Sequence, residues 1–147
     1  MIIVRDTREK EKHGWFFEPD GFVKGTVERK LDTGDYGIDG REKLICVERK
    51  ESISEFAANC TQDRFKRELE RMCEYKYRYI ILEFDMIDLM RYPQSAGKFV
   101  AERAKIGGPF ILKCMLEFEM QFGVSCILAG SYGKEVALSA LKRASNN

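Results

Sequence analysis

Residues 31–50 read LDTGDYGIDGREKLICVERK, and they hold most of what decides the fold. The apolar run 44–47 is typical of a buried strand, and its unbroken character favours a central place in a sheet. Glu48, Arg49 and Lys50 follow this run directly. Because side chains alternate along a strand, we expect Glu48 and Lys50 on one face of the sheet and Arg49 on the other.

A second acidic residue, Asp35, lies in a Gly-Asp-Tyr bend before this strand. Asp39-Gly40 predicts a hairpin turn, and such a hairpin would bring Asp35 beside Glu48. Two carboxylates can hold a hard cation such as Mg²⁺ through their oxygen atoms. A neighbouring lysine, here Lys50, can orient or deprotonate an attacking water and offset charge on a phosphorus-centred transition state.

Length and composition indicate a single globular domain over 1–147, since 44% of the 147 residues are hydrophobic and 33% are charged. The formal net charge is +1, so nucleic-acid binding would need a local cationic patch. The five cysteines lack Cys-x-x-Cys spacing, which predicts reduced packing residues and neither disulfides nor zinc ligands. No secretion signal or membrane-spanning run is found, so we expect a cytoplasmic protein without membrane contact.

The hydrophobic pattern alternates strands with helices along most of the chain. Predicted strands cover 1–4, 23–31, 44–50, 79–84 and 124–128, with a short edge segment at 36–38. Predicted helix boundaries are Ser52 or Ser54, Thr61, Pro109, Gly123 and Ser131. This order predicts an α/β fold with a mixed central sheet of about five to six strands flanked by helices.

Charged residues gather at two further places. Residues 5–9, Arg-Asp-Thr-Arg-Glu, follow the first strand, where an α/β sheet places functional groups. Taken alone, this segment favours surface ion pairs. The helix after Thr61 mixes acidic and basic residues, a pattern typical of a solvated face, and Arg64 near its start is a candidate phosphate contact.

Four motifs occur in order along the chain. They are Asp6-Thr7-Arg8-Glu9, Leu31-Asp32-Thr33-Gly34-Asp35-Tyr36, Val47-Glu48-Arg49-Lys50 and Arg64-Phe65. Together they resemble the nuclease domain of the XPF/Mus-type structure-specific endonucleases, which belong to the restriction-endonuclease-like superfamily. The later strand–helix–strand–helix order also fits, so the resemblance covers most of the chain and implies a restriction-endonuclease-like fold.

The resemblance implies a metal site. Asp35 and Glu48 would be the ligands of Mg²⁺ or Mn²⁺, and the backbone carbonyl of Arg49 would complete the shell. Asp6 is a further candidate ligand.

The resemblance also implies roles around that metal site. Lys50 would act on the attacking water, while Asp6 and Glu9 would line the same pocket and position water. Arg8 and Arg64 would contact DNA. Arg49, from the opposite face, would buttress the site. The candidate catalytic set is therefore Asp6, Glu9, Asp35, Glu48, Arg49 and Lys50.

The sequence departs from the family pattern at one motif position. The family's Glu-Arg-Lys motif continues with x-x-x-Asp, and here Ser54, next to Glu55, stands at that position. The acid–acid–lysine core is intact, so we expect activity. No segment corresponds to the tandem helix–hairpin–helix module of larger relatives, which implies a stand-alone nuclease domain.

The implied reaction is metal-assisted hydrolysis of a phosphodiester bond in DNA, leaving a 5′ phosphate and a 3′ hydroxyl. The implied substrate contains a junction between single and double strands, as in a flap, fork or branch. Two alternatives are a catalytically silent DNA-binding partner subunit and a purely structural α/β domain. Apolar and small residues on the last two helices predict packing on the sheet or a homodimer.

Overall fold

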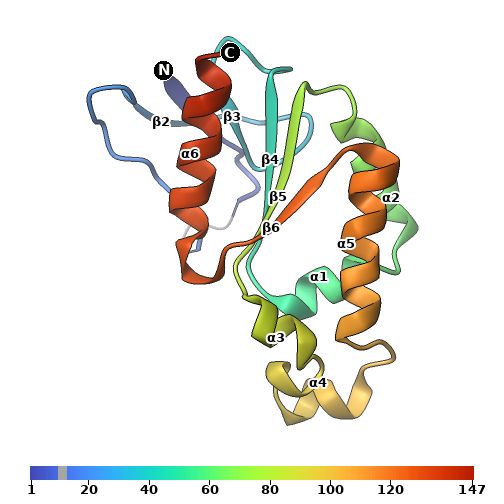
Figure 1. Ribbon diagram of the computed structural model, residues 1–147. Helices are drawn as coiled ribbons and strands as arrows, with labels where there is room; N and C mark the ends of the chain where they lie inside the picture. The colour runs from blue at the N-terminus through green and yellow to red at the C-terminus, as the bar shows by residue number, and fades with distance from the viewer. Residues whose placement is uncertain (10–12) are drawn as a thin grey trace.

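The computed structural model describes residues 1–9 and 13–147, and its strands form one mixed sheet of six strands (Figure 1). The strands are β1 Ile2–Arg5, β2 Gly25–Glu28, β3 Tyr36–Ile38, β4 Ile45–Lys50, β5 Tyr77–Leu82 and β6 Ser125–Leu128. Their order across the sheet is β2-β1-β3-β4-β5-β6. The predicted α/β class and mixed sheet are confirmed.

Strand β3 alone runs antiparallel to its neighbours, while the other five strands are parallel to one another. The first residue of β3 therefore lies at the edge of the sheet where the other strands end. Asp35 precedes β3, Asp6 follows β1, and Glu48 and Lys50 end β4. The predicted hairpin at Asp39-Gly40 is thus present, and its topology gathers these side chains at one edge.

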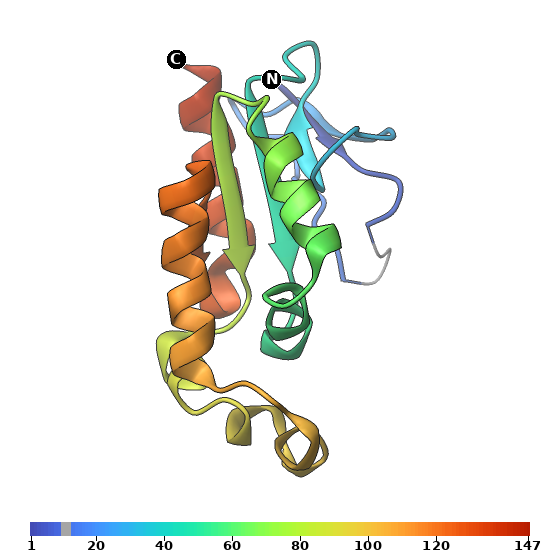
Figure 2. The same ribbon diagram turned by 90° about the vertical axis from the view of Figure 1, so that its right-hand side faces the viewer.

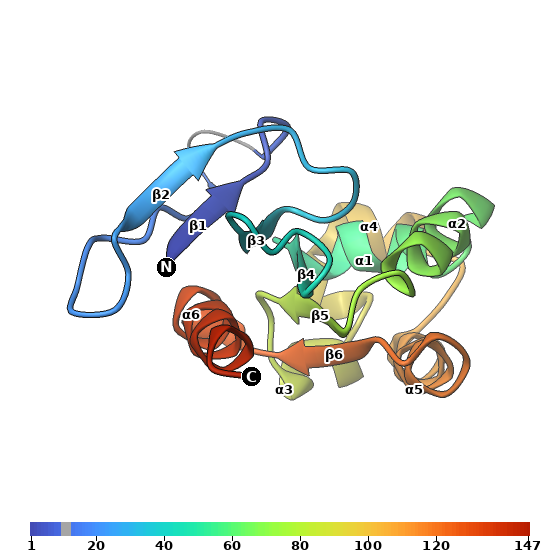
Figure 3. The same ribbon diagram turned by 90° about the horizontal axis from the view of Figure 1, so that it is seen from above.

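In the described part of the chain, six α-helices flank the sheet or lie beyond its edge. They are α1 Ile53–Asn59, α2 Asp63–Met72, α3 Met86–Met90, α4 Lys98–Arg103, α5 Gly108–Phe122 and α6 Gly133–Ser145, with short 3₁₀ turns η1 Gln94–Ala96 and η2 Gly130–Tyr132. Seen from above, α6 covers one face of the sheet and α1, α2 and α5 cover the other (Figure 3). Helices α3 and α4 project beyond the ends of β4 and β5 (Figure 2).

The alternation of side chains along β4 separates two apolar layers. Val47 packs in the layer under α6, together with Ala137 and Leu141 of that helix. Cys46 packs in the other layer, with Phe56 and other residues of α1, α2 and α5. The small residues of α6 therefore pack on the sheet, which is one of the two arrangements the sequence left open.

Helix boundaries agree with the sequence at some positions and differ at others. The Oγ of Ser52 accepts a bond from the Glu55 amide and caps α1, and Gly123 ends α5 in the left-handed region. The predicted caps at Thr61 and Ser131 are wrong. Thr61 Oγ1 donates back to the Ala58 carbonyl and the helix starts later, whereas Ser131 lies inside η2.

Strand β2 is shorter than the predicted segment 23–31, because it is an edge strand that pairs only with the four residues of β1. All five cysteines are free thiols. Within the described ranges, no helix combines the length and the apolar character needed to cross a bilayer.

Candidate active site

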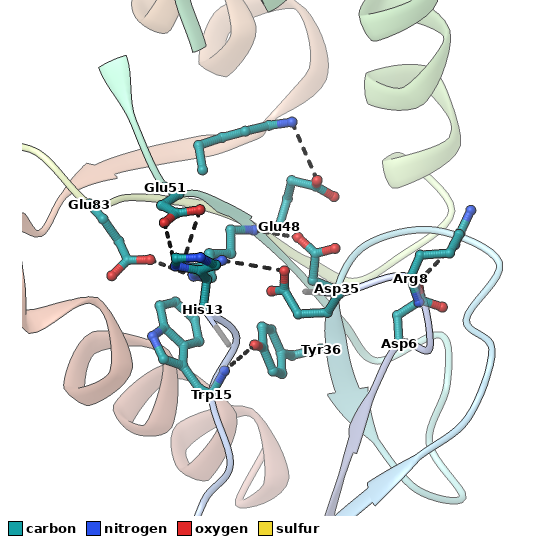
Figure 4. A network of polar contacts seen from close by, with 12 residues as sticks. Asp6, Arg8, His13, Trp15, Asp35, Tyr36, Glu48, Glu51 and Glu83 are labelled. Carbon is teal, nitrogen blue, oxygen red and sulfur yellow. Dashed lines mark hydrogen bonds and ion pairs between the residues drawn. The ribbon is translucent and has the colours of Figure 1, made fainter. Parts of the chain in front are cut away.

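A polar cleft of about 270 Å³ opens at the sheet edge where β1 and β4 end. Its lining includes Asp6, Asp35, Glu48 and Lys50, the residues that the sequence predicted to converge. Figure 4 shows Asp35 and Glu48 near one another, with Asp6 and Arg8 to one side. The rest of the lining is Arg8, Asp32, Thr33, Gly34, Asn59, Arg64, Phe65, Glu68 and Arg71.

Backbone hydrogen bonds hold Asp35 against β4. Its amide donates to the Val47 carbonyl at 2.8 Å, and its Oδ2 accepts from the Arg49 amide at 2.7 Å. The preceding Gly34 has φ +85°, and a Cβ there would lie 2.5 Å from the Cys46 Sγ and 3.2 Å from the Val47 carbonyl oxygen. Only glycine lets the bend come this close to the strand.

Asp35 and Glu48 share a poorly solvated space. Burial raises the pKa of Asp35 to about 7, and the charge of Glu9 adds to the effect. Burial also raises the pKa of Glu48 well above its usual range, with further repulsion from Asp35 and Glu68. Two crowded carboxylates of this kind are costly to ionise together, and a divalent cation between them would remove that cost.

The donor set therefore fits a hard divalent ion of the magnesium type. Among the described residues, no group of three or more His, Cys, Asp or Glu side chains forms a closed metal cluster. Mg²⁺ usually binds through one or two carboxylates and takes its other ligands from water and substrate phosphates. Asp35 and Glu48 can supply the protein's share of such a site.

Lys50 supplies the cation of the predicted core. Its Nζ lies 3.5 Å from Oε1 of Glu48 and 5.0 Å from the ring centre of Phe65 in α2. Lys50 is only 7% exposed, and packing against Phe65 holds its ammonium group in the cleft. The predicted sharing of one sheet face by Glu48 and Lys50 is thus observed.

Asp6 is 1% exposed and is used as a hydrogen-bond acceptor. Its Oδ2 accepts from the backbone and side-chain nitrogens of Arg8, and its Oδ1 accepts from the Leu31 amide. Burial opposes ionisation, but these bonds prevail and lower the pKa of Asp6. Asp6 thereby fixes the Arg8 guanidinium at the mouth of the cleft, while its role as a metal ligand stays a prediction.

Arg49 points to the opposite face of the sheet, as the alternation predicted. Its guanidinium pairs with Glu83 and, at 3.3 Å, with Glu9, and it lies 5.5 Å from the ring centre of Trp15. The amide of Trp15 donates to the hydroxyl of Tyr36 at 2.6 Å. This arrangement, part of which appears in Figure 4, supports β4 from behind.

Glu9 lies on the Arg49 side of Asp35. It lines a second hollow with Arg49, Glu51 and Glu55, into which Asp35 and Glu48 also reach. Glu9 therefore acts on Asp35 through its charge. Four residues, Arg8, Asp35, Glu48 and Lys50, line both hollows, and the shared pocket of Asp6 and Glu9 stays a prediction. The Glu9 amide donates to the Asp6 carbonyl at 3.1 Å, so the two acidic residues belong to one turn after β1.

Glu68 and Arg71 in the cleft, and Glu83 behind β4, are not among the residues that the sequence predicts for the site. Glu68 and Arg71 were assigned to a solvated helix face, although their spacing from Arg64, i, i+4 and i+7, places all three in one row. Glu83, which pairs with Arg49, directly follows an apolar strand in the same way as Glu48 does. Its place at the end of a strand is the sequence signal that could have identified Glu83.

The Ser54 position lies away from the cleft. Its side chain lines a different hollow with Tyr92 and Lys105, whereas Glu55 borders the hollow that contains Glu9. The departure from the family motif at Ser54 therefore leaves the lining of the main cleft unchanged.

Comparison with known proteins places these features in a family. The ERCC4 domain model matches residues 5–132. The fold resembles "XPF from Aeropyrum pernix", with a TM-score of 0.68 and 20% identity over 100% of this chain and 62% of that chain. A second structure, "XPF from Aeropyrum pernix, complex with DNA", gives 0.64 and 21% over 99% and 64%.

The chain spans less than two thirds of the length of these XPF chains, and at this level of identity the likeness concerns the fold. No curated protein sequence matches the chain. The family model, however, covers β2 to β6 in full and the last residue of β1, together with Asp6, Asp35, Glu48 and Lys50. The chain belongs to the ERCC4 domain family.

Proposed function

We propose that this protein is a divalent-metal-dependent DNA endonuclease that hydrolyses phosphodiester bonds near single/double-strand junctions. The observation that carries the proposal is the pairing of half-buried Asp35 with buried Glu48 in the cleft, with the Lys50 ammonium 3.5 Å from Glu48. A structural domain would gain nothing from crowding two acids in a polar cleft, because each is harder to ionise there.

Asp35 and Glu48 would hold Mg²⁺ or Mn²⁺, with the carbonyl of Arg49 and the carboxylate of Asp6 as further candidate ligands. When bound, the ion would neutralise charge on the scissile phosphate and lower the pKa of water in the cleft. The Arg49 amide, through its bond to Asp35, keeps this carboxylate aimed at the same space as Glu48.

The chain's own residues supply the remaining chemistry. Lys50, as an ammonium group, orients the attacking water and offsets charge on the transition state, and the proton that the water loses passes to solvent. The water oxygen forms a bond to phosphorus as the bond to the 3′ oxygen breaks, and the leaving oxygen takes up a proton. The products are a 5′ phosphate and a 3′ hydroxyl. Arg8, held by Asp6, and Arg64 contact the flanking phosphates.

DNA with a flap, fork or branch is the proposed substrate class. One of the matching XPF structures is a complex with DNA, which supports DNA as the ligand. The cleft is lined by charged groups suited to phosphates, so we expect shape preference over sequence preference and a strong dependence of affinity on salt.

Of the last two helices, which the sequence offers for a homodimer, we further propose that the outer face of α5 forms the interface. Leu116 is 50% exposed and Met120 is 80% exposed on that helix, while α6 is already packed on the sheet. Sedimentation at micromolar concentration tests this, and a monomeric mass would reject it. We also propose the cytoplasmic location that the sequence predicts.

The deciding experiment is a cleavage assay on labelled flap, fork, nicked and linear DNA with Mg²⁺ or Mn²⁺. Wild type should cut junction DNA, whereas Lys50→Ala and Asp35→Ala should bind but not cut. Asp39→Asn is a matched control, because Asp39 is exposed at the far end of the same hairpin. Binding without cutting by wild type would identify a silent partner subunit, and neither activity would identify a structural domain.

A further inference from the structure

Helix α2 presents one row of charged side chains to the cleft. Arg64, Glu68 and Arg71 all line it, and their spacing of i, i+4 and i+7 places them on one side of the helix. The apolar stripe of the same helix, Phe65, Leu69 and Met72, is buried. The helix is therefore fixed to the core by one stripe and offers the other to whatever enters the cleft.

The four cations of the cleft differ in whether an acid already neutralises them. Arg8 pairs with Asp6 at 2.7 Å, and Lys50 pairs with Glu48 at 3.5 Å. In the part of the chain that the structure describes, neither Arg64 nor Arg71 has an acidic partner within 4.0 Å. These two guanidinium groups are left to bind an anion from solution.

The spacing of the two arginines suits a polymer better than a single small anion. Seven residues of α-helix rise by about 10.5 Å, at about 1.5 Å per residue. Successive nucleotides of one strand in a duplex advance by about 3.4 Å, so this rise corresponds to about three nucleotides. The two Cα positions are thus about two helical turns apart, which suits separate phosphates of a DNA strand lying along α2 better than one compact phosphate.

We propose that Arg71 binds a backbone phosphate about three nucleotides away from the phosphate that Arg64 contacts, so that α2 guides one DNA strand out of the cleft. This inference rests on the proposed function, because it takes DNA as the occupant. A guanidinium group suits the task, since its planar fork can donate two parallel hydrogen bonds to a phosphate.

The first test measures equilibrium binding of a labelled fork to the whole protein in EDTA. Fluorescence anisotropy reports the affinity at each of a range of salt concentrations. Arg71→Gln should make the negative slope of log affinity against log salt shallower. The change should be about 0.9 for a duplex phosphate, or about 0.7 for a single-stranded one. With a slope change of 0.9, the ratio of wild-type affinity to Arg71→Gln affinity is about eightfold larger at 0.1 M salt than at 1 M salt.

Arg143→Gln is the matched control. Arg143 is an exposed arginine on α6, which lies on the opposite face of the sheet, and its removal changes net charge by the same amount. It should leave the slope unchanged. Equal slopes for Arg71→Gln and wild type, or equal losses in both variants, would overturn the inference. Arg71→Lys should keep the slope, because it keeps the charge.

A second test locates the contact. A series of forks, each with one neutral methylphosphonate linkage, is bound to wild type and to Arg71→Gln. One linkage should weaken wild type but have no effect on Arg71→Gln, and a different linkage should behave in this way with Arg64→Gln. Identical profiles for wild type and Arg71→Gln would overturn the assignment.

These measurements separate the two proposals. Binding needs no metal and no cleavage, so a protein that never cuts can still show the Arg71 effect, and then only the nuclease proposal fails. If wild type cuts while Arg71→Gln binds like wild type, only the present inference fails. No DNA binding by wild type would overturn both.

Discussion

The backbone N–H of Arg49 donates a hydrogen bond of 2.7 Å to Oδ2 of Asp35. The bond ties the acidic side chain of Asp35, from the bend before β3, to the peptide that joins Glu48 and Arg49. An asparagine at position 35 can accept the same bond through its amide oxygen, whereas an alanine cannot. Asp35→Asn therefore removes the charge and keeps the tie, which makes it the most informative substitution in the site.

Without metal, the protein should become less stable as the pH rises from about 4 to about 7. The pKa of Asp35 is raised from 3.8 to about 7, chiefly by burial, so the folded state binds more protons than the unfolded state in this window. The free energy of unfolding must then fall as pH rises, and level off above pH 7. Urea unfolding in EDTA at pH 5 and pH 8 measures the loss.

Asp35→Asn should show a smaller loss between these two pH values and should be more stable than wild type at pH 8. Asp39→Asn, at the exposed end of the hairpin, should keep the wild-type dependence. Wild-type stability that increases from pH 5 to pH 8 relative to Asp35→Asn would contradict the burial of an acidic pair.

Mg²⁺ should stabilise wild type, and more strongly at pH 8 than at pH 6, because protons compete for the carboxylates of Asp35 and Glu48. At a free concentration of about 100 times Kd, the gain in unfolding free energy would be about 2.7 kcal/mol. Thermal melting with and without chelator measures it. The gain should vanish in Asp35→Asn, and an undiminished gain there would place the ion elsewhere.

Arg49→Gln should destabilise the fold by about 3 kcal/mol, because it leaves Glu9 and Glu83 without their shared cation at the back of β4. The double variant Arg49→Gln/Glu83→Gln should lose less than the sum of the single losses. Urea unfolding of all four proteins completes this cycle, and strict additivity would argue against a coupled cluster.

Gly34→Ala should lower the free energy of unfolding more than Gly40→Ala or Gly21→Ala does. At Gly40, φ is +79° and the space is open, so alanine meets only backbone strain of about 1–2 kcal/mol. At Gly34, the new Cβ also meets the Cys46 Sγ at 2.5 Å. Gly21→Ala, with neither problem, serves as the baseline. The free energy of unfolding should decrease from Gly21→Ala to Gly40→Ala to Gly34→Ala. A Gly34→Ala variant as stable as Gly40→Ala would contradict the close approach of the bend to β4.

Local patterns predicted the parts of the site that depend on neighbouring residues in the chain. The alternation of Glu48, Arg49 and Lys50 follows from strand geometry, and the approach of Asp35 follows from one turn signal at Asp39-Gly40. Both survive in the structure because a hairpin needs no information from distant segments.

The parts that escaped prediction depend on tertiary contacts. The mixed charges around Arg71 look like a solvated face until α2 docks on the sheet with Phe65 inward. Thr61 and Ser131 have side chains suited to capping, but the turns before α2 and α6 leave each of them one position before the N-cap. Sequence alone does not show where such a turn ends.

The solitary reversal of β3 has a further consequence for how this fold can vary. A slip of one residue between β3 and β4 would rotate every side chain of β4 to the opposite layer. Arg49 would then enter the cleft, and the acid–lysine pair of Glu48 and Lys50 would lie against α6. Natural insertions in this protein's relatives should therefore avoid the strands themselves and gather in the turn around residues 39–43, where added length leaves the pairing of Tyr36 with Val47 intact.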